Sequence, residues 1–125
     1  MKINIKPGCG NSPKIETIKN LTIYFASYDL EKMQAYFDDN ICWTLVGNEP
    51  IIGKENFIAA LREMSDNKAS ELTITSILTH GKEGAIQGIM KMDDGNEFGF
   101  ADFYEFTSAG AKKVKSITSY VLQYP

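Results

Sequence analysis

The sequence is poor in the residues on which most metal and nucleophile sites depend. It has a single histidine, His80, and two cysteines, Cys9 and Cys42. One histidine cannot supply a site with two or three imidazole ligands, and a catalytic triad would have to use His80. Two cysteines outside a C-x-x-C pair do not make a disulfide framework. We therefore expect reduced thiols, no metal and no other cofactor.

Long apolar runs and clusters of positive charge are also missing. No stretch approaches the roughly 20 apolar residues that a membrane-spanning helix needs, and Met1–Asn11 contains no apolar run like that of a signal peptide. The 13 basic and 16 acidic residues give a net charge of -3, without a basic stripe for nucleic acid. These absences predict a cytoplasmic protein that binds neither membranes nor nucleic acids.

The residues that are present suffice for one hydrophobic core. Of the 125 residues, 43% are hydrophobic, which fits a single domain at residues 13–125. Residues 1–12 are rich in turn formers and are expected to be an irregular N-terminal arm. The chain has room for no second domain.

The first half of the chain has the spacing of helices. Apolar residues recur every three or four positions through residues 13–27, after a Ser-Pro helix start. A second, shorter helix follows Asp29 and includes Phe37, and a third follows Gly53. The run at 41–46, between the second and third helices, is rich in residues that favour strands.

The second half of the chain is extended. The expected strands are residues 71–79, 85–92, 97–107 and 113–124. Turn formers at 93–96 and 108–110 predict hairpins between consecutive strands. Helices first and strands afterwards predict an α+β fold, in which a curved antiparallel sheet of four or five strands packs on three helices.

One acidic residue interrupts an aromatic stripe on the strand 97–107. Because side chains alternate between the faces of a strand, Asp102 shares a face with Phe98, Phe100, Tyr104 and Phe106. If this face is turned inward, the carboxyl group must find hydrogen-bond donors or its pKa must rise. Asp102 is therefore the candidate catalytic or ligand-anchoring residue, and the alternative is a structural polar residue in the core.

Three motifs, in this order, resemble those of the nuclear transport factor 2-like superfamily. They are Tyr36–Asn40, the turn Gly47–Gly53 before the third helix, and the hairpin Phe106–Gly110. The superfamily includes ketosteroid isomerases and SnoaL-like polyketide cyclases, and the opening Cys9–Pro13 resembles an uncharacterised bacterial branch. The resemblance, which runs from about residue 13 onward, implies a cone-shaped sheet around the helices with an apolar pocket open at one end.

The resemblance to ketosteroid isomerase can be tested residue by residue. Aligned through the Asp38–Asp39 motif, the position of the isomerase base falls on Thr44 or Leu45, neither of which accepts a proton. The position of its oxyanion tyrosine falls on Asn20, and that of its protonated aspartate falls on Asp102. Steroid isomerisation is therefore not expected, whereas a SnoaL-like reaction with one acid remains compatible.

These considerations leave three functional hypotheses open. The first is a module that binds a small apolar or amphipathic molecule, the second is an isomerase or cyclase that uses Asp102 as its only acid, and the third is a structural or interaction domain with a solid core. The ligand-binding candidates besides Asp102 are Asn20, Tyr24, Trp43, Thr44, Phe57, Phe98, Phe100, Tyr104, Ile117, Ser119 and Val121. The binding module is favoured because no second titratable residue shares the predicted pocket face.

The outer face of the predicted sheet carries an apolar patch. Ile77, Ile89 and Phe103 lie there among small and polar residues if the strands alternate regularly. Exposed apolar patches often mark partner surfaces, and sheet-to-sheet dimers are common in the resembled superfamily. We therefore expect a homodimer that forms through this face.

Overall fold

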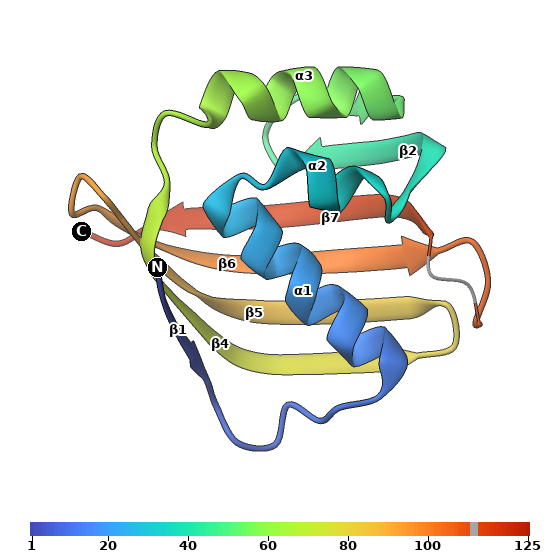
Figure 1. Cartoon of the computed structure of the whole chain (residues 1–125), viewed down its shortest axis with the longest axis horizontal. Coiled ribbons are helices and arrows are strands. Elements are labelled where there is room, and N and C mark those ends of the chain that lie inside the picture. Colours follow the sequence, from blue (N-terminus) through green and yellow to red (C-terminus); the bar gives the residue numbers. More distant parts are fainter. Residues whose placement is uncertain (111–112) are drawn as a thin grey trace.

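The computed structural model describes residues 1–110 and 113–125. In these residues three helices lie against a single seven-stranded sheet, which gives the α+β architecture that the sequence predicts (Figure 1). Along the chain the strands are β1 (Lys2–Ile5), β2 (Phe37–Leu45), β3 (Ile51–Ile52), β4 (Ala69–His80), β5 (Glu83–Met92), β6 (Glu97–Phe106) and β7 (Val114–Gln123). Their order in the sheet is β1-β4-β5-β6-β7-β2-β3. The β1–β4 and β2–β7 pairs are parallel and the other pairs are antiparallel, so the sheet is mixed and larger than the expected four or five antiparallel strands.

The helices begin where the sequence places their caps. In α1 (Pro13–Ser27) the Ser12 side chain accepts a hydrogen bond from the Ile15 amide, and α2 (Leu30–Gln34) is capped in the same way by Asp29. The third helix, α3 (Lys54–Met64), follows Gly53, whose φ of 96° suits glycine. None of the helices in the described residues is long and apolar enough to cross a membrane.

The second predicted helix is too long at its C-terminal end. It stops at Gln34, and Phe37 is instead the first residue of β2 (Phe37–Leu45), where it is 1% exposed. Asp38 and Asp39 also lie in this strand, whose pairing with β7 is irregular between Phe37 and Cys42. Phe37 fits a helical and an extended pattern equally well, and its packing on Phe57 at 4.8 Å between ring centroids favours the strand.

The four strands of the second half form the body of the sheet. They are β4 (Ala69–His80), β5 (Glu83–Met92), β6 (Glu97–Phe106) and β7 (Val114–Gln123). A short strand that the sequence did not predict, β3 (Ile51–Ile52), extends the sheet beyond β2. Residues 108–110, where the sequence predicts a hairpin, follow β6, and residues 111–112 lie outside the described residues.

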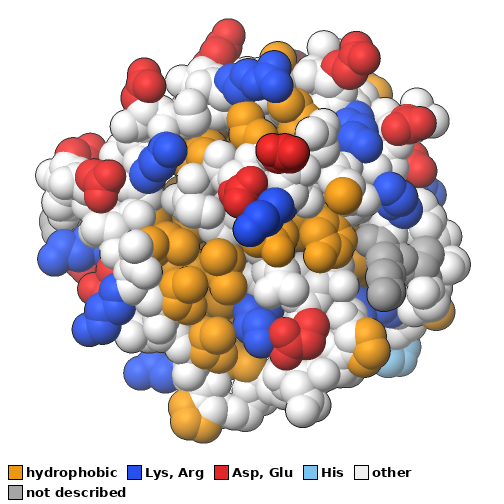
Figure 2. All heavy atoms as spheres, viewed as in Figure 1, with side chains coloured by type: hydrophobic (Ala, Val, Ile, Leu, Met, Phe, Trp, Pro, Cys, Tyr) orange, Lys and Arg blue, Asp and Glu red, His pale blue; other side chains and the backbone are white. Residues whose placement is uncertain are grey.

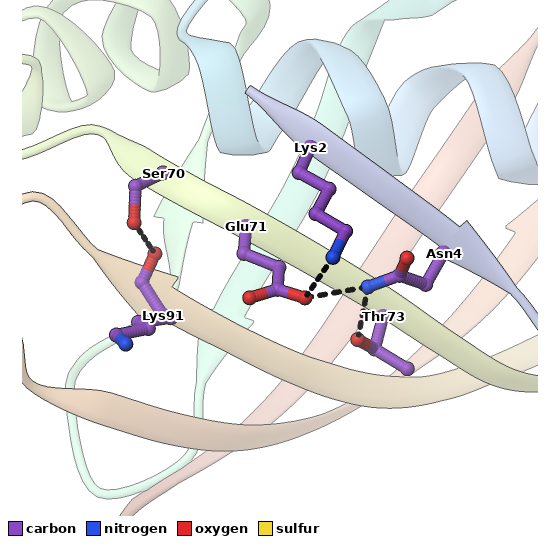
Figure 3. A network of polar contacts seen from close by, with 6 residues as sticks. All are labelled: Lys2, Asn4, Ser70, Glu71, Thr73 and Lys91. Atoms are coloured by element: carbon purple, nitrogen blue, oxygen red, sulfur yellow. Dashed lines mark hydrogen bonds and ion pairs between the residues drawn. The ribbon is translucent and has the colours of Figure 1, made fainter.

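The N-terminal arm is partly regular, contrary to expectation. Residues Lys2–Ile5 form β1, which pairs in parallel with β4 and covers its edge. The Asn4 amide donates to the Glu71 carboxylate at 2.6 Å and to the Thr73 hydroxyl at 3.3 Å, and Lys2 lies 4.0 Å from Glu71 (Figure 3). The strand depends on these partners distant in sequence, so its local pattern did not reveal it.

Two glycines allow α1 and the strands to approach closely. A side chain at Gly84 would overlap the Cδ1 atom of Ile18 on α1, and one at Gly88 would overlap the Thr73 carbonyl oxygen. Gly88 lies next to an irregularity in the β4–β5 pairing, between Ile74 and Ser76. Irregularities of this kind bend a sheet, and Figure 1 shows β4 to β7 curving behind α1.

The same irregularity corrects the prediction for Ile77. It shifts the alternation of β4 by one position, so that Ile77 turns into the core with 3% of its surface exposed, while Leu78 faces outward with 71% exposed. Phe103 does lie on the outer face as predicted, with its ring edge-on to Tyr120 at 5.9 Å.

Candidate functional site

A cavity of about 230 Å³ lies between the C-terminal half of α1, α3 and the inner face of the sheet, and it is partly open to solvent. Its walls are almost wholly apolar. The helices contribute Thr22, Phe25, Ala26, Tyr28, Leu61 and Met64. The strands contribute Trp43, Leu45, Met90, Met92, Phe100, Asp102, Ser119 and Val121. Figure 2 shows the face that carries the helices, where apolar side chains are visible among charged ones.

Asp102 is the carboxylate in this wall. It lies on β6, directly across from Ser119 on β7 and Ile86 on β5, and points to the inner face as the aromatic stripe predicts. Burial raises the pKa of its carboxyl group from 3.8 to about 6, and hydrogen bonding with Ser119 lowers that pKa in part. The group therefore changes its charge close to neutral pH.

Ser119 connects Asp102 to the indole of Trp43. The Trp43 Nε1–H donates to the Ser119 hydroxyl oxygen at 3.0 Å, which leaves the hydroxyl proton free to turn toward Asp102. The Phe57 ring stacks on the indole of Trp43, with 4.8 Å between ring centroids, and restricts its orientation. The orientation of the carboxyl group is thus held by packed residues on β2, β7 and α3.

Tyr104 adds a second buried polar group two residues along β6. Its hydroxyl is inaccessible and has no hydrogen bond of normal geometry in the described residues. The nearby Thr22 hydroxyl donates its one proton to the Ile18 carbonyl at 2.9 Å, so that proton is not available to Tyr104. Burial is the main cause that raises the pKa of Tyr104 above its ordinary value, and the charge of Asp102 raises it further, so the phenol stays protonated.

Comparisons with known proteins show the family of this chain. The SnoaL-like domain family matches residues 21–115. The chain belongs to the SnoaL-like domain family. Among curated proteins none matches it.

Solved structures place the SnoaL-like domain in the nuclear transport factor 2-like superfamily. A protein of this superfamily of unknown function from Cytophaga hutchinsonii is 25% identical over 86% of this chain and 97% of its own, with a TM-score of 0.68. A candidate SnoaL-like polyketide cyclase from Shewanella denitrificans is 10% identical over 89% of this chain and 92% of its own, with a TM-score of 0.74. A candidate ketosteroid isomerase from Kribbella flavida is 18% identical over 88% of this chain and 81% of its own, with a TM-score of 0.70. The last two likenesses show the fold alone.

The resemblance assigns the position of the isomerase base to Thr44 or Leu45, and only Leu45 lies in the cavity wall. Leu45 lines the cavity, and Thr44, its neighbour on β2, has its side chain on the opposite face of the strand. A leucine side chain has no group that accepts a proton. Neither of the two residues therefore brings a proton-accepting group into the cavity of this SnoaL-like domain.

The structure brings five of the predicted site residues together around the cavity: Trp43, Phe100, Asp102, Ser119 and Val121. The other candidates lie outside its lining: Asn20, Tyr24, Thr44, Phe57, Phe98, Tyr104 and Ile117. Phe57, Tyr104 and Ile117 are core residues with 2% exposure or less. Tyr24 lies beside Tyr36, with 6.3 Å between ring centroids.

Sequence reasoning missed much of the lining, above all the methionines Met64, Met90 and Met92. They lie near the ends of α3 and β5, where the apolar pattern of each element ends and gives no sign of a pocket. Thr22 and Ala26 were missed because small residues do not stand out in a hydrophobic pattern, although they continue the spacing of four from the buried Ile18.

The remaining candidates for chemistry do not form a site. Among residues 1–110 and 113–125, no three histidine, cysteine or acidic side chains gather as metal ligands. Cys9 and Cys42 are free thiols, and Cys9 is buried. His80 is exposed at the end of β4.

Proposed function

We propose that this domain binds a small, mostly apolar molecule in the cavity, with Asp102 holding the polar atom of that molecule. The observation that carries the proposal is an apolar cavity with a single carboxylate in its wall. Ligand pockets commonly combine apolar walls with a few polar groups that fix the orientation of the ligand. The hydrogen bond between Trp43 and Ser119 supports the proposal, because it prepares Ser119 to orient the carboxyl group.

The cavity limits the size of the molecule. An apolar cavity of about 150 Å³ is enough to hold benzene, and drug-sized ligands occupy pockets from about 300 Å³ upward. At about 230 Å³ this cavity suits one ring with a short substituent. A four-ring steroid would need more space, which is a second argument against a ketosteroid isomerase.

A pocket-filling variant tests the proposal. Ala26 on α1 lines the cavity and is 2% exposed, so Ala26→Leu places three more carbon atoms inside it. Ala59→Leu is the matched control, because Ala59 is exposed on α3. A fragment screen by ligand-observed NMR should give hits for the natural protein and the control that Ala26→Leu loses. Hits that persist in folded Ala26→Leu would refute the proposal. Native mass spectrometry of the purified protein can identify a retained ligand.

An isomerase or cyclase with Asp102 as its only acid is the second candidate. The raised pKa of Asp102, about 6, favours it, since a proton donor or acceptor works best when its pKa is near the working pH. A hit that the natural protein converts and Asp102→Asn does not convert would support this candidate. Hits that bind to both proteins and remain unchanged in the presence of either would refute it.

We also propose that the domain forms a homodimer through the outer face of the sheet. Leu78, Phe103, Tyr120 and Leu122 lie on this face, and each exposes half of its surface or more. Water contact with so much apolar surface is unfavourable, and a second copy would remove it. Sedimentation at micromolar concentration should show a dimer that Phe103→Lys converts to a monomer. A monomeric natural protein at that concentration would contradict this.

A further inference from the structure

Among residues 1–110 and 113–125, the carboxylate in the cavity has no positive partner. The described ion pairs, such as Lys2–Glu71 and Lys82–Glu105, lie at the surface and do not involve Asp102. Within the cavity lining, α3 and β5 contribute leucine and methionine, β2 contributes Trp43 and Leu45, and β7 contributes Ser119 and Val121. Asp102 is thus the one charged side chain among the described residues of the lining.

In the part of the chain that the structure describes, two tyrosines are titratable groups near Asp102. Tyr28 closes α1 and lines the cavity, and burial raises the pKa of its phenol. Tyr104 lies two residues beyond Asp102 on β6, outside the cavity lining, and burial raises the pKa of its phenol too. Both groups are therefore neutral at physiological pH, and neither supplies the positive charge that a buried carboxylate needs.

We propose that the ligand of this cavity is a small organic cation, an ammonium group on a single ring or short apolar chain, whose charge pairs with the Asp102 carboxylate. This inference rests on the proposed function and specifies the chemical class of its ligand. A ligand cation supplies the partner that the protein lacks. An anionic ligand would place two negative charges together in an apolar site, which is unfavourable.

The aromatic walls favour the same class. Phe25, Tyr28, Trp43 and Phe100 line the cavity around Asp102. The faces of aromatic rings carry negative charge and attract ammonium groups, most strongly where water is excluded. The walls can therefore offset part of the lost hydration of the cation, while the carboxylate determines where its charge lies.

Three probes with one carbon skeleton separate the effect of charge from that of shape. Phenethylamine is a cation, phenethyl alcohol is neutral and phenylacetate is an anion at pH 7, and each has one ring and a short chain. Calorimetric titration should show that the amine binds about tenfold or more tightly than the alcohol, with the anion weakest. The variant Asp102→Asn should lose this preference for the amine and keep the affinity for the alcohol within about threefold.

The natural protein gives a test that needs no variant. Lowering the pH below about 6 protonates Asp102, so the affinity for the amine should fall while that for the alcohol does not. Equal affinity for amine and alcohol, or no amine binding, overturns the inference. The same holds if Asp102→Asn weakens all three probes equally. The proposed function survives these outcomes if other hits are lost in Ala26→Leu, and fails if none is lost.

Discussion

Replacing Asp102 with asparagine should raise the stability of the domain at neutral pH and leave it nearly unchanged in acid. Burial raises the pKa of Asp102 from 3.8 to about 6, so the folded state holds this proton more tightly than the unfolded state. Stability therefore falls as the pH rises through this window. This rise in pKa, from 3.8 to about 6, corresponds to about 3 kcal/mol of stability, of which about 2 kcal/mol is lost between pH 4.5 and 7.

Urea unfolding at a series of pH values between 4.5 and 7.5 measures this effect. The free energy of unfolding of Asp102→Asn minus that of the natural protein should increase with pH by about 2 kcal/mol, with an unchanged m-value. The control is Asp66→Asn, which removes an exposed carboxylate beyond α3 and leaves the interior untouched. A difference that stays constant or decreases as the pH rises would refute the assignment of a buried, destabilised carboxylate.

Three further substitutions test the packing around the site by urea or thermal unfolding. Gly88→Ala should cost about 2 kcal/mol or more, because its methyl group would overlap the Thr73 carbonyl oxygen; a neutral effect would contradict the close approach. Trp43→Phe should cost about 1 to 2 kcal/mol, since it removes the hydrogen bond to Ser119 and part of the indole, and an unchanged stability would count against that bond. Tyr104→Phe should be neutral or stabilise by about 1 kcal/mol, because its hydroxyl is buried without a normal hydrogen bond; a clear loss would reveal a partner.

The spacing of apolar residues along the sequence correctly predicted which faces of α1 and β6 are buried. The face of α1 follows the helical repeat through Ile18 and Leu21, both fully buried. The inward face of β6 follows strict alternation, which is why Asp102 was placed correctly among the aromatic residues. These elements needed no information about distant partners.

The errors arose where partners distant in sequence decide the structure. The strand β1 is largely exposed, and its bonds to β4 come from residues about 70 positions away. Ile77 was placed outward because the alternation was extended through an irregularity that only the pairing with β5 reveals. The cavity lining was missed for the same reason: Met64 and Met90 belong to different elements, which meet only in the folded chain.

The raised pKa of Asp102 and the expected preference of the cavity for a cation are thermodynamically linked. A ligand that returns the pKa of Asp102 from about 6 to 3.8 must bind the ionised form roughly 150-fold more tightly than the protonated form, because the two shifts share a thermodynamic cycle. A cation can do this, whereas a neutral ligand cannot supply the opposite charge. If bound phenethylamine lowers the pKa of Asp102, followed by NMR, by the amount that its pH-dependent affinity requires, the carboxylate is the site of the coupling. If the affinity depends on pH while the pKa of Asp102 stays fixed, another group is responsible.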